Sequence, residues 1–408
     1  MLTYVSTIIK RVKKYGIFCV LKVGFNNKIL LPVDRFLFKI AKKIWGKSKL
    51  RDVIILESHN DFDSNGGAFY DYLIYNNINK AYKIIWFVRN KCPDNLPQNV
   101  YCYNYNIPNL KKNYYNCIAK YILYCHVPIQ KVQKDQIVVY MTHGPFGLKN
   151  FKGKVVLPQD VTSILCPSEY VAPILADQYQ IGYPNEKQIF LGYPMHDCLY
   201  EDGSGDFEKI SRKYYDCKVL WMPTFRKTND FHRNDSTAEF PLGLPIFKTI
   251  EELEELNKML ISFNAILIIK IHPMQDRTTV KIGQYSNIVV LDANSVKHLN
   301  INNYKLMKDV DALISDYSSV AYDYLHLNRP IAYTMDDIND YKLGLLFDNP
   351  QEFLAGPILN NSDDFVKFIV SVISREDSFE EKRKEVLKRV FKYQDGESSR
   401  RLAEYIGI

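Results

Sequence analysis

The sequence lacks any uncharged apolar run approaching the roughly 20 residues that a membrane-spanning helix needs, so we expect no spanning segment. Its eight cysteines form no CxxC pair and show no zinc-site spacing, and no signal-peptide cleavage pattern precedes them. We therefore expect reduced, mostly packed thiols in a cytoplasmic protein. Internal repeats and low-complexity tracts are also absent, which excludes solenoid and fibrous architectures.

The composition is that of a folded globular protein, because 47% of the residues are hydrophobic and 24% are charged. The aromatic content is high, with 30 Tyr and 22 Phe. A chain of 408 residues exceeds what one hydrophobic core usually supports. We therefore expect two domains with appended segments.

The positive charge is concentrated at the N-terminus. Residues 1–50 contain 12 Lys or Arg and one acid, Asp34, which gives this segment a net charge of +11. Since the whole chain carries +7, the remaining residues carry a net −4. This distribution argues against a nucleic-acid surface spread over the protein and favours an anionic membrane surface as the partner of the N-terminus.

Bulky apolar residues alternate with the basic residues between Lys10 and Lys49. Such a mixture is typical of an interfacial helix, whose apolar face enters the acyl boundary while Lys and Arg contact anionic headgroups. The alternative is a basic helix that packs on the protein itself. We expect the interfacial helix, and therefore a peripheral protein at the cytoplasmic face of the membrane.

From Arg51 onward, short apolar runs alternate with helical stretches, as in parallel α/β sheets covered on both faces. A first helix is expected at about 67–76. The first set of expected strands is 53–56, 83–88, 136–141 and 163–166, and the second set is 218–222, 265–270, 288–291, 312–315 and 330–333. A Gly-rich acidic stretch at 201–206 separates the two sets. The predicted domains are residues 1–50, 51–205, 206–375 and a helical tail at 376–408.

Polar segments follow four of the expected strands, at the carboxyl ends where doubly wound sheets bind ligands. These segments are THGPFGLK at 142–149, MPTFR at 222–226, KIHP at 270–273 and SDYSSV at 315–320. Each segment alone is a weak signal. Together they predict a binding site formed by the strand ends of both domains.

His143 directly follows an apolar strand and precedes Gly144, which suits a side chain exposed at a turn. An imidazole has an ordinary pKa near 6.5 and is suited to remove a proton from an attacking hydroxyl. The alternative is a histidine that only caps the turn. We predict a general base at this position.

Ser318 and Ser319 lie between an expected strand and a helix running through Tyr324, so their hydroxyls and the free N–H groups predict an anion site. Serine N-capping explains the same pattern and is compatible with it. Arg226 and His272, at two other strand ends, are predicted to stabilise a departing phosphate.

Further candidates share the same four segments. Thr224 is grouped with the phosphate-binding residues, and Lys149 and Lys270 are additional candidates. Asp316 and Asp323 are predicted to bind ribose hydroxyls, to orient a histidine or to start a helix. The sequence shows no cluster of metal ligands.

These segments, together with FDNPQEFLAGPI near the C-terminus, resemble the CDP-glycerol glycerophosphotransferases, a family of teichoic acid primases, polymerases and related capsule polymerases. The resemblance covers about residues 53–370. It implies a GT-B fold, in which two Rossmann-type domains with parallel sheets face a cleft. It also implies that His143 is the base of the first domain and that His272, Arg226, Ser318 and Ser319 surround the donor phosphates.

The implied reaction transfers a polyol phosphate from CDP-glycerol or CDP-ribitol to a hydroxyl of a lipid-linked saccharide or polymer, and it releases CMP. No cofactor is implied beyond the CDP-polyol donor, and a divalent cation and a homo-oligomer are left open. One alternative is a nucleotide-sugar glycosyltransferase with the same fold. The other is a non-catalytic scaffold at the membrane surface.

Overall fold

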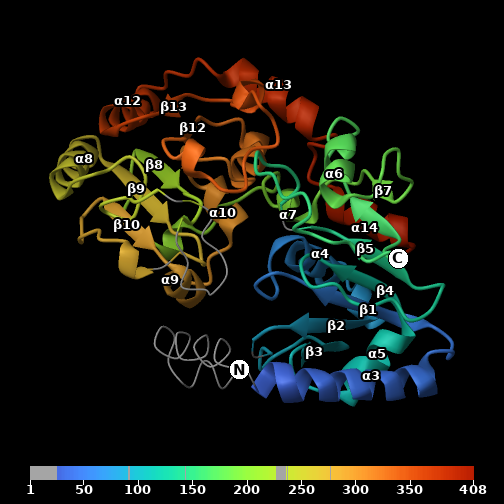
Figure 1. Cartoon of the computed structure of the whole chain (residues 1–408). Helices are drawn as coiled ribbons and strands as arrows, with labels where there is room; N and C mark the ends of the chain where they lie inside the picture. Colours follow the sequence, from blue (N-terminus) through green and yellow to red (C-terminus); the bar gives the residue numbers. More distant parts are fainter. Residues whose placement is uncertain (1–24, 91, 143, 227–235, 237, 276) are drawn as a thin grey trace, which may run out of the picture.

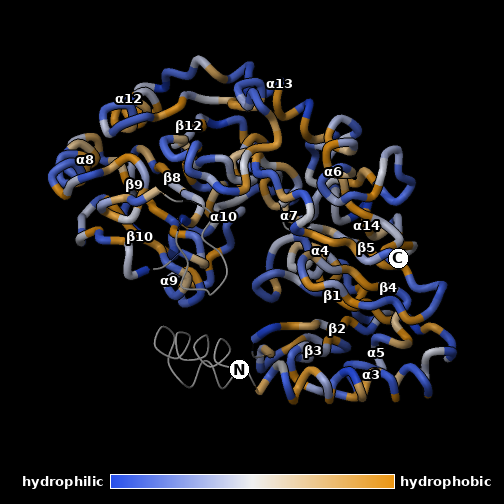
Figure 2. The backbone as a smooth tube through the Cα atoms, in the orientation of Figure 1, coloured by the Kyte–Doolittle hydropathy of each residue, from blue (hydrophilic) through white to orange (hydrophobic). Residues whose placement is uncertain are grey.

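The computed structural model describes residues 25–408 except 91, 143, 227–235, 237 and 276 (Figure 1). Two β-sheets form two lobes, and every neighbouring pair of strands in both sheets is parallel. The strands are buried along most of their length, as expected for sheets covered on both faces. Figure 2 shows the hydrophobic residues concentrated along these strands.

The first lobe contains a seven-stranded sheet in the order β3-β2-β1-β4-β5-β6-β7. Its strands are β1 (Arg51–Glu57), β2 (Lys83–Val88), β3 (Val100–Asn104), β4 (Ala119–Tyr124), β5 (Ile137–Tyr140), β6 (Ser163–Leu165) and β7 (Gln188–Ile189). Its helices are α4 (Ser64–Tyr75), η2 (Ile78–Lys80), α5 (Leu110–Ile118), α6 (Ala172–Tyr179) and α7 (Pro194–Asp197). The strand order reverses between β1 and β4, which makes this pair the topological switch point of the sheet.

The second lobe contains a six-stranded sheet in the order β10-β9-β8-β11-β12-β13, with its switch point between β8 and β11. Its strands are β8 (Cys217–Trp221), β9 (Ala265–Lys270), β10 (Ile288–Leu291), β11 (Ala312–Ser315), β12 (Ile331–Thr334) and β13 (Ile358–Leu359). Its α-helices before the C-terminal tail are α8 (Ile250–Ser262), α9 (Ala293–His298), α10 (Asn303–Lys308) and α11 (Val320–Asp323). Its 3-10 helices are η3 (Phe207–Lys209), η4 (Arg277–Thr279), η5 (Tyr324–Leu327), η6 (Ile338–Asp340) and η7 (Pro350–Phe353).

The C-terminal helices α12 (Ser362–Ile373), α13 (Glu380–Val390) and α14 (Ser398–Ile406) lead from the second lobe back to the first (Figure 1). Asp197 in α7 accepts hydrogen bonds from the backbone N–H groups of Ser398 and Ser399, at 2.9 and 2.7 Å. The hydroxyl groups of Ser163 and Tyr405 lie 2.7 Å apart. The tail therefore joins the two lobes, while the predicted domain boundaries stay predictions.

At the N-terminus, η1 (Asn26–Leu30) leads into α3 (Leu31–Trp45), and one face of α3 packs on α5 of the first lobe. Lys112 donates to Asp34 at 2.8 Å, and the rings of Trp45 and Tyr114 lie 5.0 Å apart. Residues 1–24 of the predicted interfacial segment lie outside the described residues. Within the described part of the chain, no helix combines the length and hydropathy needed to cross a bilayer.

The cysteine prediction is wrong for one pair, because Cys92 and Cys102 form a disulfide with Cα atoms 5.7 Å apart. Cys92 lies in the loop after β2 and Cys102 lies in β3, and pairing of these neighbouring strands brings the two residues together. Cys117, Cys125 and Cys166 are buried free thiols, as predicted.

Candidate functional site

The switch point of the second lobe brings together two of the predicted segments, which follow β8 and β11. The carboxylate of Asp316 accepts hydrogen bonds from the backbone N–H and the hydroxyl of Thr224, both at 2.7 Å. Asp316 also accepts from the backbone N–H of Ser318 at 3.0 Å. Asp316 is thus a buried acceptor that fixes both loops relative to each other.

Arg226 lies in the same network, and its side chain is only 4% exposed. Its guanidinium donates to Asp337 at 2.7 and 2.9 Å, to Asp316 at 2.8 Å and to the carbonyl oxygen of Thr224 at 2.5 Å. These contacts favour a positioning role over an open phosphate ligand. Direct contact of Arg226 with phosphate stays a prediction.

Electrostatics explain why this network tolerates burial. Complete burial alone would raise the pKa of Asp316, but the positive charges of Arg226 and Lys149 hold it below its ordinary value. Asp316 therefore stays ionised and retains the acceptor capacity that its contacts require.

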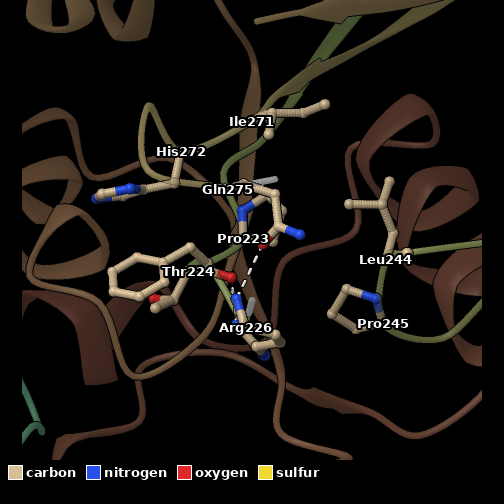
Figure 3. A pocket seen from close by; sticks show the side chains of 10 residues that line it. Pro223, Thr224, Arg226, Leu244, Pro245, Ile271, His272 and Gln275 are labelled. Carbon is tan, nitrogen blue, oxygen red and sulfur yellow. Dashed lines mark hydrogen bonds between the residues drawn. The ribbon is translucent and has the colours of Figure 1, made fainter. Parts of the chain in front are cut away.

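His272 lies at the end of β9, beside a small cavity whose lining includes Thr224, Arg226 and Gln275 (Figure 3). The cavity has a volume of about 10 Å³, room for about one water. The Nδ1 atom of His272 accepts from the backbone N–H of Met274 at 3.1 Å. A neutral imidazole then carries its proton on Nε2, which suits donation to an anion.

Lys270, the last residue of β9, is 5% exposed, and burial lowers its pKa to about 8. Its ordinary pKa is 10.5, and this difference corresponds to about 3 kcal/mol of folding free energy. Because the folded-state pKa is depressed, the cost of burying the charge is fully present below pH 8. The cost fades as the pH rises from 8 to 10.5.

Replacing Lys270 with Met is therefore expected to increase the free energy of unfolding by up to about 3 kcal/mol at pH 7, with a smaller gain at pH 9.5. Urea unfolding at the two pH values measures the difference. Lys258→Met, at an exposed lysine of α8, is the matched control and should change little. A Lys270→Met protein that is less stable than wild type by equal amounts at both pH values would contradict the prediction.

The loop after β5 in the first lobe contacts the second lobe at Ser319. A Cβ atom added at Gly147 would lie 3.1 Å from the backbone nitrogen of Ser319, and one at Gly144 would lie 3.1 Å from its hydroxyl oxygen. Glycine at these positions permits the close approach of the two loops. Ser318 and Ser319 are half-buried here, and their hydroxyls make no hydrogen bond to the described residues.

Lys149 also crosses between the lobes, since its Nζ donates to the hydroxyl of Thr224 at 2.9 Å. The backbone N–H of Leu346 donates to the carbonyl oxygen of Leu148 at 2.8 Å, which extends this contact. The structure thus brings Gly144, Lys149, Thr224 and Ser319 to one place. The loops at the carboxyl ends of the two sheets therefore meet there.

His143, the predicted base, lies outside the described residues. Its neighbour Thr142 has a φ angle of 52°, in the left-handed region that a β-branched residue rarely adopts. Asn65 donates to the carbonyl oxygens of Met141 and Thr142 at 3.0 and 2.9 Å. The chain is thus held in an unusual turn immediately before position 143.

Asp323 lies apart from the polar groups around Asp316 and instead contacts a buried histidine. Its carboxylate lies 2.8 Å from Nε2 of His196 and accepts from Tyr304 at 3.2 Å. The rings of His196 and His326 lie 4.4 Å apart, and burial, followed by the influence of His196, lowers the pKa of His326 well below its ordinary value. Sequence reasoning missed this buried network, although the segment FLGYPMHDCL contains His196.

Among the described residues, no group of three or more His, Cys, Asp or Glu side chains is arranged to hold a metal ion.

Comparisons with known proteins give consistent results. The family model described as CDP-glycerol:poly(glycerophosphate) glycerophosphotransferase matches residues 40–407. The teichoic acid poly(ribitol-phosphate) polymerase of Bacillus spizizenii is 26% identical over 296 residues, which cover 68% of this chain and 44% of the relative. The teichoic acid poly(glycerol phosphate) polymerase of the same species is 25% identical over 374 residues, which cover 84% and 88%.

The solved structure of the wall teichoic acid polymerase TagF has a TM-score of 0.70 at 19% identity, over 91% of this chain and 93% of that chain. This likeness confirms the predicted GT-B-like fold class. The chain spans less than half the length of the first three curated relatives that it matches, at 44%, 44% and 40%.

Proposed function

Since the chain belongs to the family of CDP-glycerol:poly(glycerophosphate) glycerophosphotransferases, we propose that it is a polyol-phosphate transferase. CDP-glycerol is the first candidate for the donor, and CDP-ribitol is the second. The acceptor is a hydroxyl of a lipid-linked saccharide or polymer, and CMP is released. The product belongs to a teichoic-acid-like or capsular polymer of the cell envelope.

The meeting of the two lobes at Ser319 supports this proposal most directly. The glycine loop at 144–147 lies so close to the serine that a Cβ atom added at Gly144 or Gly147 would come within 3.1 Å of it, and Lys149 adds a positive charge from the first lobe. A diphosphate bound at Ser318 and Ser319 would therefore lie between the two lobes. The acceptor hydroxyl would approach from the first lobe.

In the proposed reaction, the acceptor oxygen attacks the β-phosphorus of the CDP-polyol in line with the bond to CMP. A new phosphodiester P–O bond forms as the bond to the bridging oxygen breaks, and CMP leaves with that electron pair. His143 takes the hydroxyl proton. His272 donates from Nε2 to the developing negative charge, while Thr224, Arg226 and Asp316 hold the loops in place.

Mass spectrometry of products tests this function with CDP-glycerol, CDP-ribitol and a panel of UDP- and GDP-sugars as donors, each with and without a chelator. Transfer of a polyol phosphate with release of CMP is expected. Transfer only from nucleotide sugars would identify the chain as a glycosyltransferase. A scaffold would show no thermal stabilisation by CDP, whereas a ligand at 100 times its Kd adds about 2.7 kcal/mol.

We also propose that the protein binds the cytoplasmic face of the membrane through α3. Exposed apolar residues repeat here at helical spacing, with Val33, Phe36 and Ile44 in α3 and Phe25 and Ile29 directly before it. Exposed lysines and arginines flank these residues. The packing of α3 on α5 and an interfacial role are therefore compatible, because Asp34 and Trp45 contact α5 while the apolar side chains of Val33, Phe36 and Ile44 remain exposed.

Replacing Phe36 and Ile44 together by Glu is expected to weaken binding to anionic vesicles by at least about 100-fold, since each bulky side chain contributes about 1.5–3 kcal/mol when buried. Co-sedimentation with phosphatidylglycerol vesicles measures the change. Tyr75→Glu is the matched control, because Tyr75, the last residue of α4, is 86% exposed. Removing residues 1–50 would also expose the face of α5 that α3 covers, so the double substitution tests membrane binding without disturbing that packing. Equal sedimentation of the variant and wild type would contradict the assignment.

A further inference from the structure

The first lobe has its own topological switch point, between β1 and β4, and the side chains there have no role in the reaction described above. In the second lobe, the corresponding point between β8 and β11 holds the proposed donor site. Ligands of open parallel sheets bind at such points, beyond the carboxyl ends of the strands. The residues that follow β1 and β4, and those that follow the neighbouring strand β2, are therefore candidates for a second binding site.

Two histidines lie together at this switch point. His59 follows β1, His126 follows β4, and their ring centroids are 4.4 Å apart with the planes at 72°. His126 is exposed and His59 is half-buried. Both imidazoles thus lie at the carboxyl edge of the first sheet, after β1 and β4.

Glu57, at the end of β1, holds this edge in place. Its Oε2 atom accepts from the backbone N–H groups of Cys125 and His126, at 3.1 and 2.9 Å. The side chain is fully buried, and burial raises its pKa despite these hydrogen bonds. Glu57 therefore acts on a ligand only through His126, as a positioning residue.

Arg89 adds a permanent positive charge directly after β2. Its backbone N–H donates to Asp61 at 2.8 Å, and the same carboxylate accepts from the backbone N–H of Asn90 at 3.0 Å. The negative charge of Asp61 is thus engaged by backbone N–H groups. The Arg89 guanidinium lies close enough to Tyr105 and Glu57 to oppose the rise that burial causes in the pKa of each, and its Nε atom makes no hydrogen bond to the described residues.

We propose that His59, Arg89 and His126 bind the phosphate nearest the growing end of the acceptor. This inference rests on the proposed function. Imidazole and guanidinium N–H groups match the oxygens of a phosphate, and the acceptor polymer carries phosphodiesters. Strand β5 lies beside β4, at a spacing of about 4.8 Å, so an acceptor phosphate bound here places the adjacent polyol hydroxyl near the segment that contains His143.

A binding experiment tests the site without turnover. The protein is first saturated with CDP, which fills the donor site, and is then titrated calorimetrically with sn-glycerol 3-phosphate or with glycerol. Wild type is expected to bind only the phosphate-bearing probe. His126→Ala and Arg89→Ala should each weaken that binding by about 10- to 100-fold. His298→Ala and Arg212→Ala, at exposed positions of the second lobe, are the matched controls.

Steady-state kinetics distinguish this proposal from the proposed function. Failure of wild type to turn over any CDP-polyol would overturn the proposed function. Turnover by wild type, with an acceptor KM that rises about 10- to 100-fold in His126→Ala while the donor KM stays unchanged, is the expected result. An unchanged acceptor KM in both variants would overturn the acceptor site. An equal loss with a phosphate-free saccharide acceptor would also overturn phosphate recognition.

Discussion

Replacing Arg226 by Met is expected to destabilise the protein by about 3–5 kcal/mol, because it removes the guanidinium that pairs with the buried carboxylates of both Asp316 and Asp337. Both carboxylates are at most 1% exposed, so water cannot replace the lost guanidinium. Chemical unfolding of the variant and wild type measures the effect. A direct phosphate ligand on the surface would cost CDP affinity with little loss of stability.

Ser319→Ala provides the contrast, since its half-buried hydroxyl makes no hydrogen bond to the described residues. It should weaken CDP binding by about 10- to 100-fold and leave stability near that of wild type. Pairing Arg226→Met with Asp316→Asn should recover part of the lost stability, because one uncompensated charge is removed. An Arg226→Met protein with wild-type stability would show that the ion pairs of Arg226 with Asp316 and Asp337 do not stabilise the fold.

Replacing His143 by Ala is expected to lower kcat by about 10²- to 10⁴-fold while CDP affinity stays near wild type. The reason is that a base on the acceptor side removes a proton in the transition state and does not contact the nucleotide. The intact enzyme should show a rate that rises with pH through one ionisation. That ionisation should be absent from the variant.

His272→Ala is the matched comparison, because it removes an imidazole from the second lobe, where the donor is proposed to bind. It should weaken both CDP binding and turnover. An unchanged melting temperature is required of both variants, since structural damage would mimic either loss. A His143→Ala enzyme with wild-type kcat on a competent acceptor would leave that histidine as a turn residue.

The sequence determined the most apolar strands almost to the residue. The predicted ranges 83–88, 265–270, 288–291 and 312–315 match β2, β9, β10 and β11. Continuous runs of Ile, Val and Leu have this predictive strength because only strands buried on both faces need them. Because these strands were predicted correctly, the positions of the loops at their carboxyl ends, such as the loop with Asp316 and Ser319, were predicted as well.

The sequence did not reveal β3, β4, β7 and β13. Strand β4 reads AKYILY and begins directly after α5, with no intervening loop residue to mark the change of structure. Strands β7 and β13 contain two residues each, too few for any periodicity. Without β4, the switch point of the first lobe and the pair of His59 with His126 had no sequence signal.

Only the tertiary structure decided what each polar side chain contacts. Arg226 and Asp337 are 111 positions apart, and Lys149 and Thr224 are 75 apart. No local pattern encodes such pairs, because strand order and packing of the lobes bring them together. The sequence alone determined that the loops containing Thr224, His272 and Ser319 gather at the carboxyl end of the second sheet. The fold determined that Arg226 faces two carboxylates, that Asp323 orients His196, and that Ser319 faces a glycine loop from the other lobe.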